Sequence, residues 1–276
     1  MDRPYFLCFD GYYLSAYGIS AVREDGQWIS LDISKYDGDA AGFLKNVPFD
    51  KIGAFVFEPG SANGMVKLPP KDLVCAIEAK IKEAGGIIIA NEVTTGMGRT
   101  GKWFGHRHYG MRPDVVAIGK GIGNGYPVSV AAFSKPIADL VEKSDFKYAQ
   151  SHQDDPLGCA VAKEVIACIE SNGYIQNSAK MGTVLGHELV RLQQKHSCIK
   201  EVRGIGLMYV MEFFDGQGIA LEKIHKELFD RGYIVGVSPV AGLLRFYPPL
   251  TIDEEQIKAM GNCLDAVLSM LKTEEG

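Results

Sequence analysis

The chain has 276 residues, of which 46% are apolar, and its 29 basic and 34 acidic side chains give a net charge of −5. This size allows one large core or two unequal ones. Because the basic residues are scattered among acidic ones, a nucleic-acid partner is not expected. No apolar stretch reaches the roughly 20 residues that span a bilayer. The start, Met1-Asp-Arg-Pro-Tyr, lacks the layout of a signal peptide. We therefore expect small-molecule chemistry without a membrane partner.

The spacing of the cysteines bears on the cellular compartment of the protein. None of the six belongs to a CxxC pair, and several fall at helix-like apolar positions; they are Cys8, Cys75, Cys159, Cys168, Cys198 and Cys263. Such cysteines are typical of reduced core residues. We therefore expect a cytoplasmic protein.

The first part of the chain alternates apolar runs with a helical pattern. Strands are predicted at 52–58, 86–90, 115–119 and 128–134, and a helix at 70–84. Alternation of this kind indicates an α/β fold with a mostly parallel sheet that is covered on both faces. A long helix should begin near Asp154, where Asp154-Asp155-Pro156 supplies an N-cap and a first-turn proline, and should end near Ser171.

The pattern changes near residue 172, where we place a domain boundary. After it we expect an α+β unit with helices at 174–196, 219–231 and 253–271 and strands at 199–203, 207–213, 233–237 and 243–247. The expected domains are therefore residues 1–171 and residues 172–276.

Lys120 lies in a glycine-rich loop directly after an apolar run, and Asn91 ends the apolar run before it. Two buried strands would bring this amine and this short polar side chain to one sheet edge, which suggests a Schiff-base site for pyridoxal phosphate. The glycines let a planar cofactor approach, and a strand behind the amine should dehydrate it and favour its neutral form. The alternative is an ordinary solvated loop lysine.

Four motifs then occur in order along the chain. They are Glu58-Pro59 after a strand, the segment from Asn91-Glu-Val-Thr-Thr-Gly to Arg99-Thr-Gly, the Gly-Lys120-Gly loop, and Arg245-Phe-Tyr-Pro-Pro-Leu. Together they resemble the class III (ω-type) aminotransferases. The resemblance implies the type I fold of pyridoxal-phosphate-dependent transferases, with a partial large domain and a C-terminal small domain. It also implies transfer of an amino group between an amino acid and a 2-oxo acid.

The resemblance also implies a role for each matching position. Lys120 would form the Schiff base with pyridoxal phosphate and then move the proton. Val93 would pack on one face of the cofactor ring and Phe9 on the other, and Thr94 would lie near the phenolic oxygen. Ser151 stands for a threonine that reaches the phosphate of the neighbouring subunit.

Two further positions concern the substrate. Arg245 matches the arginine that binds a substrate carboxylate. Glu58 would also bind the substrate. On local evidence Arg245 could equally form a structural ion pair, and Val93, Phe9 and Ser151 could be ordinary core or turn residues.

A metal site is not predicted. His106 and His108 lie close to each other in sequence, and His152 follows later. No carboxylate or cysteine falls at a ligand-like spacing from them.

Asn91 departs from the family pattern, which has an aspartate there. An amide can hydrogen-bond the ring nitrogen of the cofactor but supplies no counter-charge. The loss of about 1–2 kcal/mol would slow the reaction on the order of ten- to thirty-fold. A less electron-withdrawing ring also suits simple proton exchange, so an amino-acid racemase or epimerase of the same fold is an alternative.

The family's phosphate-binding turn has no counterpart ahead of Phe9, and Asn63 stands where the family has a glutamate. We therefore expect an N-terminally truncated enzyme with exposed sheet edges, which would act as a homodimer or with a partner fragment. A non-catalytic or split-enzyme subunit is the third hypothesis.

Overall fold

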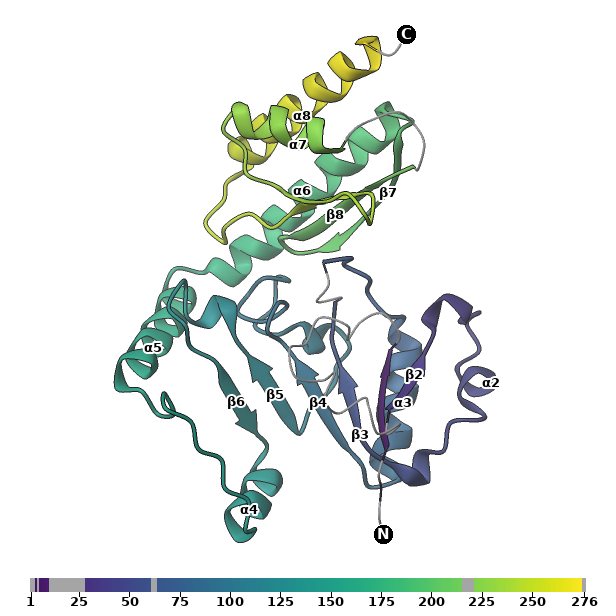
Figure 1. The fold of residues 1–276 in the computed structure, drawn as a ribbon, viewed down its shortest axis with the longest axis vertical. Coiled ribbons are helices and arrows are strands. Elements are labelled where there is room, and N and C mark those ends of the chain that lie inside the picture. The colour runs from purple at the N-terminus through teal and green to yellow at the C-terminus, as the bar shows by residue number, and fades with distance from the viewer. Residues whose placement is uncertain (1–2, 4, 10–27, 61–63, 215–220, 275–276) are drawn as a thin grey trace. The chain divides into compact units, whose positions relative to one another are not determined.

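The computed structural model describes residues 3, 5–9, 28–60, 64–214 and 221–274, with side chains up to 271 (Figure 1). The expectation at Asn63 lies outside these residues. The chain divides into two compact units. The first contains residues 1–63, 68–97 and 104–172, and the second contains residues 64–67, 98–103 and 173–276.

The first unit is built on a six-stranded sheet. Its strands run in the order β2 (Trp28–Leu31), β1 (Tyr5–Phe9), β3 (Ile52–Phe57), β4 (Ile87–Asn91), β5 (Val115–Ile118) and β6 (Val130–Phe133). Every neighbouring pair is parallel except β5 and β6. The mixed, mostly parallel sheet of an α/β fold is thus confirmed. β1 and β2 were not among the strands predicted from the sequence.

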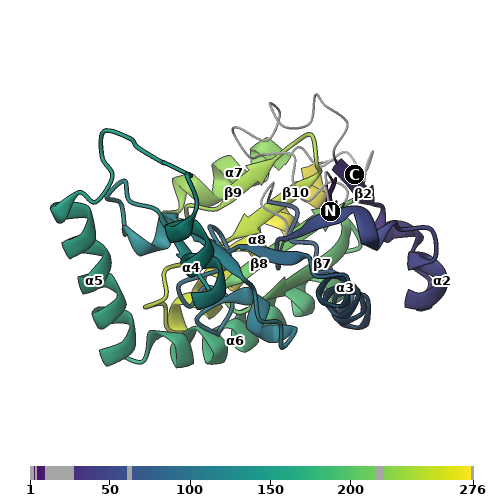
Figure 2. The same ribbon diagram turned by 90° about the horizontal axis from the view of Figure 1, so that it is seen from below.

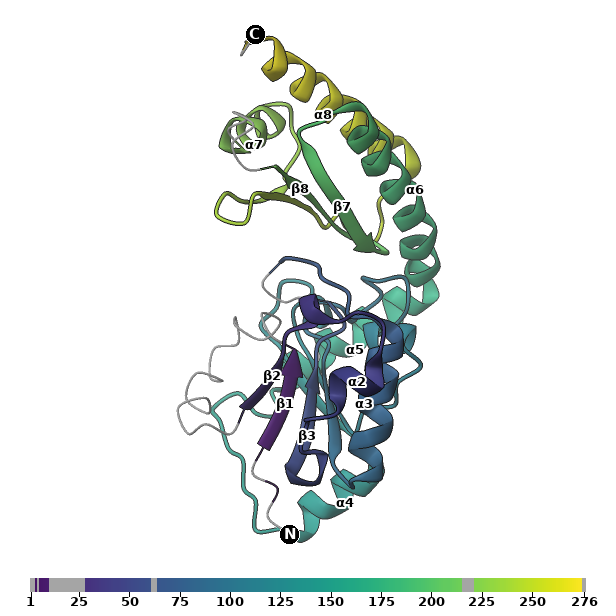
Figure 3. The same ribbon diagram turned by 90° about the vertical axis from the view of Figure 1, so that its right-hand side faces the viewer.

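One face of this sheet carries the core of the unit. Helix α3 (Lys71–Glu83) lies along that face (Figure 3) and buries Leu73, Val74, Ile77 and Ile81. Their helical spacing makes one apolar stripe.

The opposite face is less covered than the sequence predicted. In β4, Ile88 and Ala90 are buried, whereas Ile87, Ile89 and Asn91 are only half-buried. The continuous apolar run of β4 predicted burial on both faces, but the described residues bury only the side that faces α3.

The β6 edge is exposed. All four residues of β6 are exposed, and large exposed apolar side chains continue through α4 (Lys135–Lys143) to α5 (Pro156–Ser171); they are Val130, Phe133, Leu140, Phe146, Tyr148, Leu157 and Ile166. This agrees with the expected exposure of a sheet edge.

The N-cap of helix α5 is Asp155, one residue after the predicted start near Asp154. Asp155 accepts the Gly158 N–H at 2.8 Å.

The second unit is α+β. Its antiparallel sheet has the order β7 (Ile199–Ile205), β8 (Met208–Phe213), β10 (Leu243–Phe246) and β9 (Gly236–Ser238). Helices α6 (Tyr174–Lys195), α7 (Leu221–Asp230) and α8 (Glu254–Glu274) pack with it, and α7 lies beside β9 (Figure 2). Strand β9 starts later than predicted, so residues 233–235 are not part of the sheet. No described helix is long and apolar enough to cross a membrane.

Arg99 belongs to the second unit and explains part of the Arg-Thr-Gly motif. Its Nη1 donates to the carbonyl oxygens of Leu207, at 3.1 Å, and Pro248. Burial lowers the pKa of this guanidinium. Arg99 therefore ties the 98–103 segment to the turns of the antiparallel sheet.

Candidate active site

Lys120 is the first residue of a short 3-10 turn that follows β5. Its Nζ donates to Thr94 Oγ1 at 2.8 Å. The backbone of Lys120 has φ +46°, a left-handed conformation that costs a non-glycine residue about 1–3 kcal/mol. Such strain persists where the surrounding structure imposes it, and it is concentrated at functional sites.

The sheet explains why Lys120 and Thr94 meet. β4 and β5 are parallel, with Asn91 opposite Ala117, and the Glu92 N–H donates to the Ala117 carbonyl at 2.8 Å. The two chains therefore leave the sheet side by side at its carboxyl edge, the usual ligand edge of an open α/β sheet.

Asn91 and Val93 lie at the same edge. The Val93 backbone N–H donates to Asn91 Oδ1 at 3.1 Å, so the amide oxygen is already engaged and the NH₂ group is the donor that Asn91 offers. A Cβ built on Gly119 would lie 3.4 Å from the Val93 side chain. The Gly119 backbone therefore lies within ordinary van der Waals reach of Val93, so the Lys120 loop passes directly beside that side chain.

The exposure of Lys120 differs from the sequence expectation. The residue is exposed in the described chain, whereas an apolar strand behind the amine was expected to dehydrate it. Strand β5 does precede Lys120, but the described residues leave the lysine exposed. Dehydration of the amine is therefore not provided by the described residues.

A buried carboxylate that the sequence analysis overlooked organises the neighbouring loop. Glu92 is 0% exposed. Its Oε2 accepts from Thr95 Oγ1 at 2.6 Å and from the Gly105 N–H at 2.8 Å. Its Oε1 lies 2.7 Å from the His106 N–H and 2.9 Å from His106 Nδ1. Four donors on one carboxylate hold the 92–95 turn against the 105–106 turn.

The sequence did contain a signal for this network. Asn91 and Val93 were both assigned to the cofactor side, and strand alternation then directs Glu92 to the other side, where a charge needs partners. His106 is one of those partners.

In the described residues no group of histidine, cysteine and carboxylate side chains has the arrangement of a metal site.

A side-chain hydrogen bond holds the far end of the glycine-rich loop. The Tyr126 hydroxyl donates to Asp155 Oδ2 at 3.0 Å, and Asp155 is the N-cap of α5. The Gly158 N–H and this hydroxyl lower the pKa of Asp155, and the carboxylate raises the pKa of Tyr126. The loop after Lys120 is thereby fixed to a 16-residue helix.

Phe9 is not brought to Asn91. It is 1% exposed and packs edge-on against Phe55 and Phe57, with ring centroids 5.5 and 6.4 Å away. Phe57 pairs with Ala90, so these rings share the face of α3, and Asn91, one residue further, points to the opposite face. Phe9 is thus a core residue, which was the alternative that the sequence analysis left open for it. Residues 10–27 after it lie outside the described chain.

Glu58 and Ser151 belong to the first unit as well. Glu58 is 2% exposed and follows Phe57, so continued alternation puts it on the face that holds Asn91. Ser151 is exposed, in the turn segment between α4 and α5.

Arg245 belongs to the second unit. It lies on β10, is half-buried, and its Nη2 donates to the Val237 carbonyl at 3.3 Å. A Cβ on Gly64 would lie 2.5 Å from Arg245 Nη1, so the guanidinium packs directly on the backbone there.

The comparison with known families decides the identity. The family model described as "Aminotransferase class-III" matches residues 38–268. The chain belongs to this family. The resemblance first indicated by four motifs is thereby confirmed across most of the sequence.

Individual proteins are also similar to this class-III chain over most of its length. It is 34% identical to an acetylornithine aminotransferase of Caldanaerobacter subterraneus, with 81% of this chain and 55% of the relative covered. It is 31% identical to ethanolamine-phosphate phospho-lyase homolog 1 of Caenorhabditis elegans, covering 86% of this chain and 53% of the relative. The chain spans about half the length of the curated relatives it matches.

A solved structure supports the fold. A thermostable (S)-enantioselective ω-transaminase from Thermomicrobium roseum superposes with a TM-score of 0.82 at 28% identity, over 98% of this chain and 68% of that structure. The type I transferase fold of this class-III chain is thereby confirmed. Pyridoxal phosphate is the cofactor of this family.

The residues at the carboxyl edge of β4 and β5 suit pyridoxal phosphate. Lys120 offers an accessible primary amine, Asn91 offers an amide donor, and Val93 offers an apolar surface beside it. A planar heterocycle with an aldehyde and a ring nitrogen needs these three kinds of contact.

Proposed function

We propose that this class-III chain supplies the cofactor-binding lysine of an aminotransferase. The enzyme would move an amino group between an amino acid and a 2-oxo acid. The observation that carries the proposal is the placement of the Lys120 amine on Thr94, beside Asn91 and Val93. The aminotransferase names of several relatives favour transamination over proton exchange alone.

Each residue at this edge has a proposed task. Lys120 would hold the cofactor through Nζ, and the same nitrogen, once the substrate amine has taken its place, would carry the proton. Thr94 orients that nitrogen through its hydroxyl. Asn91 would donate to the ring nitrogen, and Val93 would support the ring. The bound cofactor supplies the electron-withdrawing ring that stabilises negative charge on the substrate carbon.

Three further residues are assigned in the same proposal. Ser151 would reach the cofactor phosphate of the neighbouring subunit, which its exposure supports. Arg245 would bind the substrate carboxylate, supported by a planar guanidinium held against Gly64. Glu58 would face the substrate, supported by its position on the Asn91 side of the sheet. Phe9 is left out because it faces the other side.

The organisation of the protein is part of the proposal. Residues 1–171 would form the partial cofactor domain and residues 172–276 the small domain, which the two compact units support. A homodimer partner or a separate N-terminal fragment would cover the exposed apolar side chains near β6. The six cysteines form no disulfide, which supports a cytoplasmic location.

Borohydride trapping tests the proposal. The chain is incubated with pyridoxal phosphate, reduced, digested and analysed by peptide mass spectrometry. We expect the cofactor mass on Lys120, and its loss in Lys120→Ala but not in Lys135→Ala, a matched exposed lysine of the same unit. Labelling that is spread over many lysines, or that is unchanged in Lys120→Ala, would contradict the proposal. Amino-group transfer from glutamate, measured with and without the N-terminal segment of a longer relative, tests the reaction itself.

A further inference from the structure

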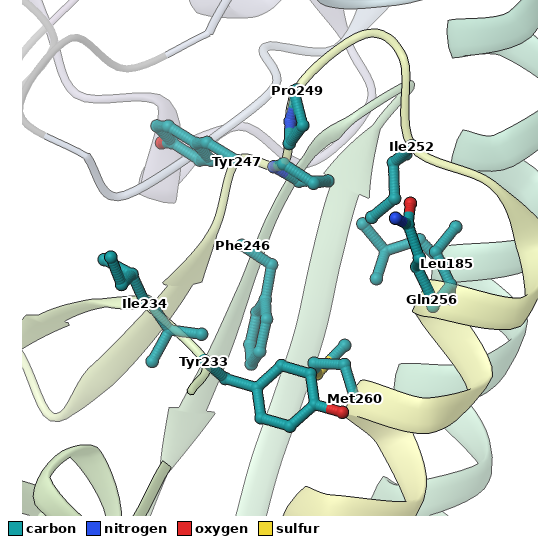
Figure 4. Close-up of a pocket in the computed structure, with 12 residues that line it drawn as sticks. Leu185, Tyr233, Ile234, Phe246, Tyr247, Pro249, Ile252, Gln256 and Met260 are labelled. Atoms are coloured by element: carbon teal, nitrogen blue, oxygen red, sulfur yellow. The ribbon is translucent and has the colours of Figure 1, made fainter. Parts of the chain in front are cut away.

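The second unit contains a pocket of about 170 Å³ at the end of β10 (Figure 4). Its floor is made of core residues, among them Leu185 of α6, Phe246 of β10 and Met260 of α8, which are 1%, 3% and 9% exposed. All twelve side chains that line it are uncharged. The pocket is therefore a mostly apolar site that disfavours ions, because a charge placed there would lose part of its hydration.

The walls of the pocket are held open by the backbone. Pro248 and Pro249 form one wall, and their fixed φ angles limit collapse. Val235 lies on another wall, and His225 Nε2 donates to its carbonyl at 3.0 Å. Figure 4 shows Tyr233 beside Met260 and Gln256 beside Ile252.

Gln256 gives the pocket a directional polar group. Its Oε1 accepts the Asp253 N–H at 3.1 Å, and Asp253 Oδ1 accepts the Gln256 N–H at 2.8 Å. This reciprocal capping pair occupies the amide oxygen. The remaining NH₂ group of Gln256 is a donor, so it favours a ligand with a hydrogen-bond acceptor.

We propose that this pocket binds a small uncharged aromatic molecule with one hydrogen-bond acceptor. Its ring would lie against Phe246 and Met260, with its acceptor toward the Gln256 amide. The volume supports this class, since an apolar cavity of roughly 150 Å³ lined by similar side chains binds benzene. The pocket lies wholly in the second unit and uses none of the residues assigned to cofactor chemistry, so the proposal does not depend on the proposed function.

Methyl NMR of the full chain labelled with ¹³C-methyl methionine tests the site, with the Met260 signal assigned by Met260→Leu. The chain is titrated with anisole, toluene and benzoate. We expect a saturable Met260 shift, with anisole binding about three- to tenfold more tightly than toluene and benzoate causing no shift. The result should be the same in Lys120→Ala. No saturable shift with anisole, or equal binding of anisole and toluene, would overturn the proposal.

Two variants locate the ligand. Ile252→Trp, at the half-buried rim, should abolish the anisole shift by filling the pocket, whereas Val240→Ala, at a fully exposed position outside it, should not. Gln256→Glu keeps an acceptor for the Asp253 N–H but removes the donor, so anisole should fall to the affinity of toluene. Unchanged anisole binding in both Ile252→Trp and Gln256→Glu would show that the ligand binds elsewhere.

Discussion

Lys120 Nζ donates to Thr94 Oγ1 at 2.8 Å, and this bond joins the turns that follow two adjacent parallel strands. We predict that Thr94→Val slows attachment of pyridoxal phosphate about three- to tenfold, because a hydrogen bond of about 1 kcal/mol no longer orients the amine. Stopped-flow absorbance measures this rate. Thr94→Ser keeps the hydroxyl and should react at nearly the wild-type rate. Equal rates for valine and serine would remove Thr94 from the site.

Asn91→Asp tests the departure from the family pattern. The Val93 N–H can still donate to the aspartate, so the local turn is preserved. The carboxylate cannot donate to the ring nitrogen as the Asn91 amide does, but it favours the protonated form of that nitrogen. The charge-assisted bond that results should be stronger by about 1–2 kcal/mol and raise the rate of amino-group transfer on the order of ten- to thirty-fold. Single-turnover kinetics with glutamate measure the change. An unchanged or slower rate in Asn91→Asp would contradict this prediction.

Glu92→Gln should destabilise the first unit. The substitution directs an NH₂ group at backbone donors in a fully buried site, and we expect a loss of about 2–4 kcal/mol in the free energy of unfolding. Urea denaturation measures this loss. Glu83→Gln, on the exposed end of α3, is the matched control and should stay within about 0.5 kcal/mol of the wild type. A small effect at Glu92 would mean that the network is not required.

Asp265 should make the second unit sensitive to acid. Lys195 Nζ, at 2.7 Å, and His196 Nε2, at 2.6 Å, hold the pKa of the Asp265 carboxyl at about 2, below its ordinary 3.8. A carboxyl whose pKa is lower in the folded state contributes stability above its unfolded pKa and loses it as the pH falls through the folded value.

We therefore expect stability to fall between pH 3.8 and pH 2 in the wild type, and this fall to be weaker in Asp265→Asn. The variant should also be less stable at pH 7. Circular dichroism melts across this pH range measure both effects, and Glu255→Gln on the exposed face of α8 is the control. An identical acid profile in Asp265→Asn would contradict the assignment.

The sequence predicted much of the candidate site because its signals are local. The apolar runs that became β4 and β5 are continuous, and parallel strands must deliver their next residues to one edge. That reasoning brought Asn91 and Lys120 together without a structure. The capping residues before α5 likewise located its start to within one residue.

Contacts between segments distant in sequence were not predicted. The Glu92 partners at Gly105 and His106 become neighbours only when the 105–108 turn folds back on the strand end. The position of Phe9 depends on which face of β1 meets α3, and a one-residue change of register would reverse it.

By itself the sequence determined the α/β class and the family, and it located Lys120 in the loop after a strand, since periodicity and ordered motifs are properties of the chain. Only the tertiary structure decided which polar groups are paired, which sheet face is covered, and that Lys120 is exposed on a left-handed turn. The physical reason is that burial and hydrogen-bond partners depend on strand register and on packing between distant segments, and neither is encoded in any short stretch of residues.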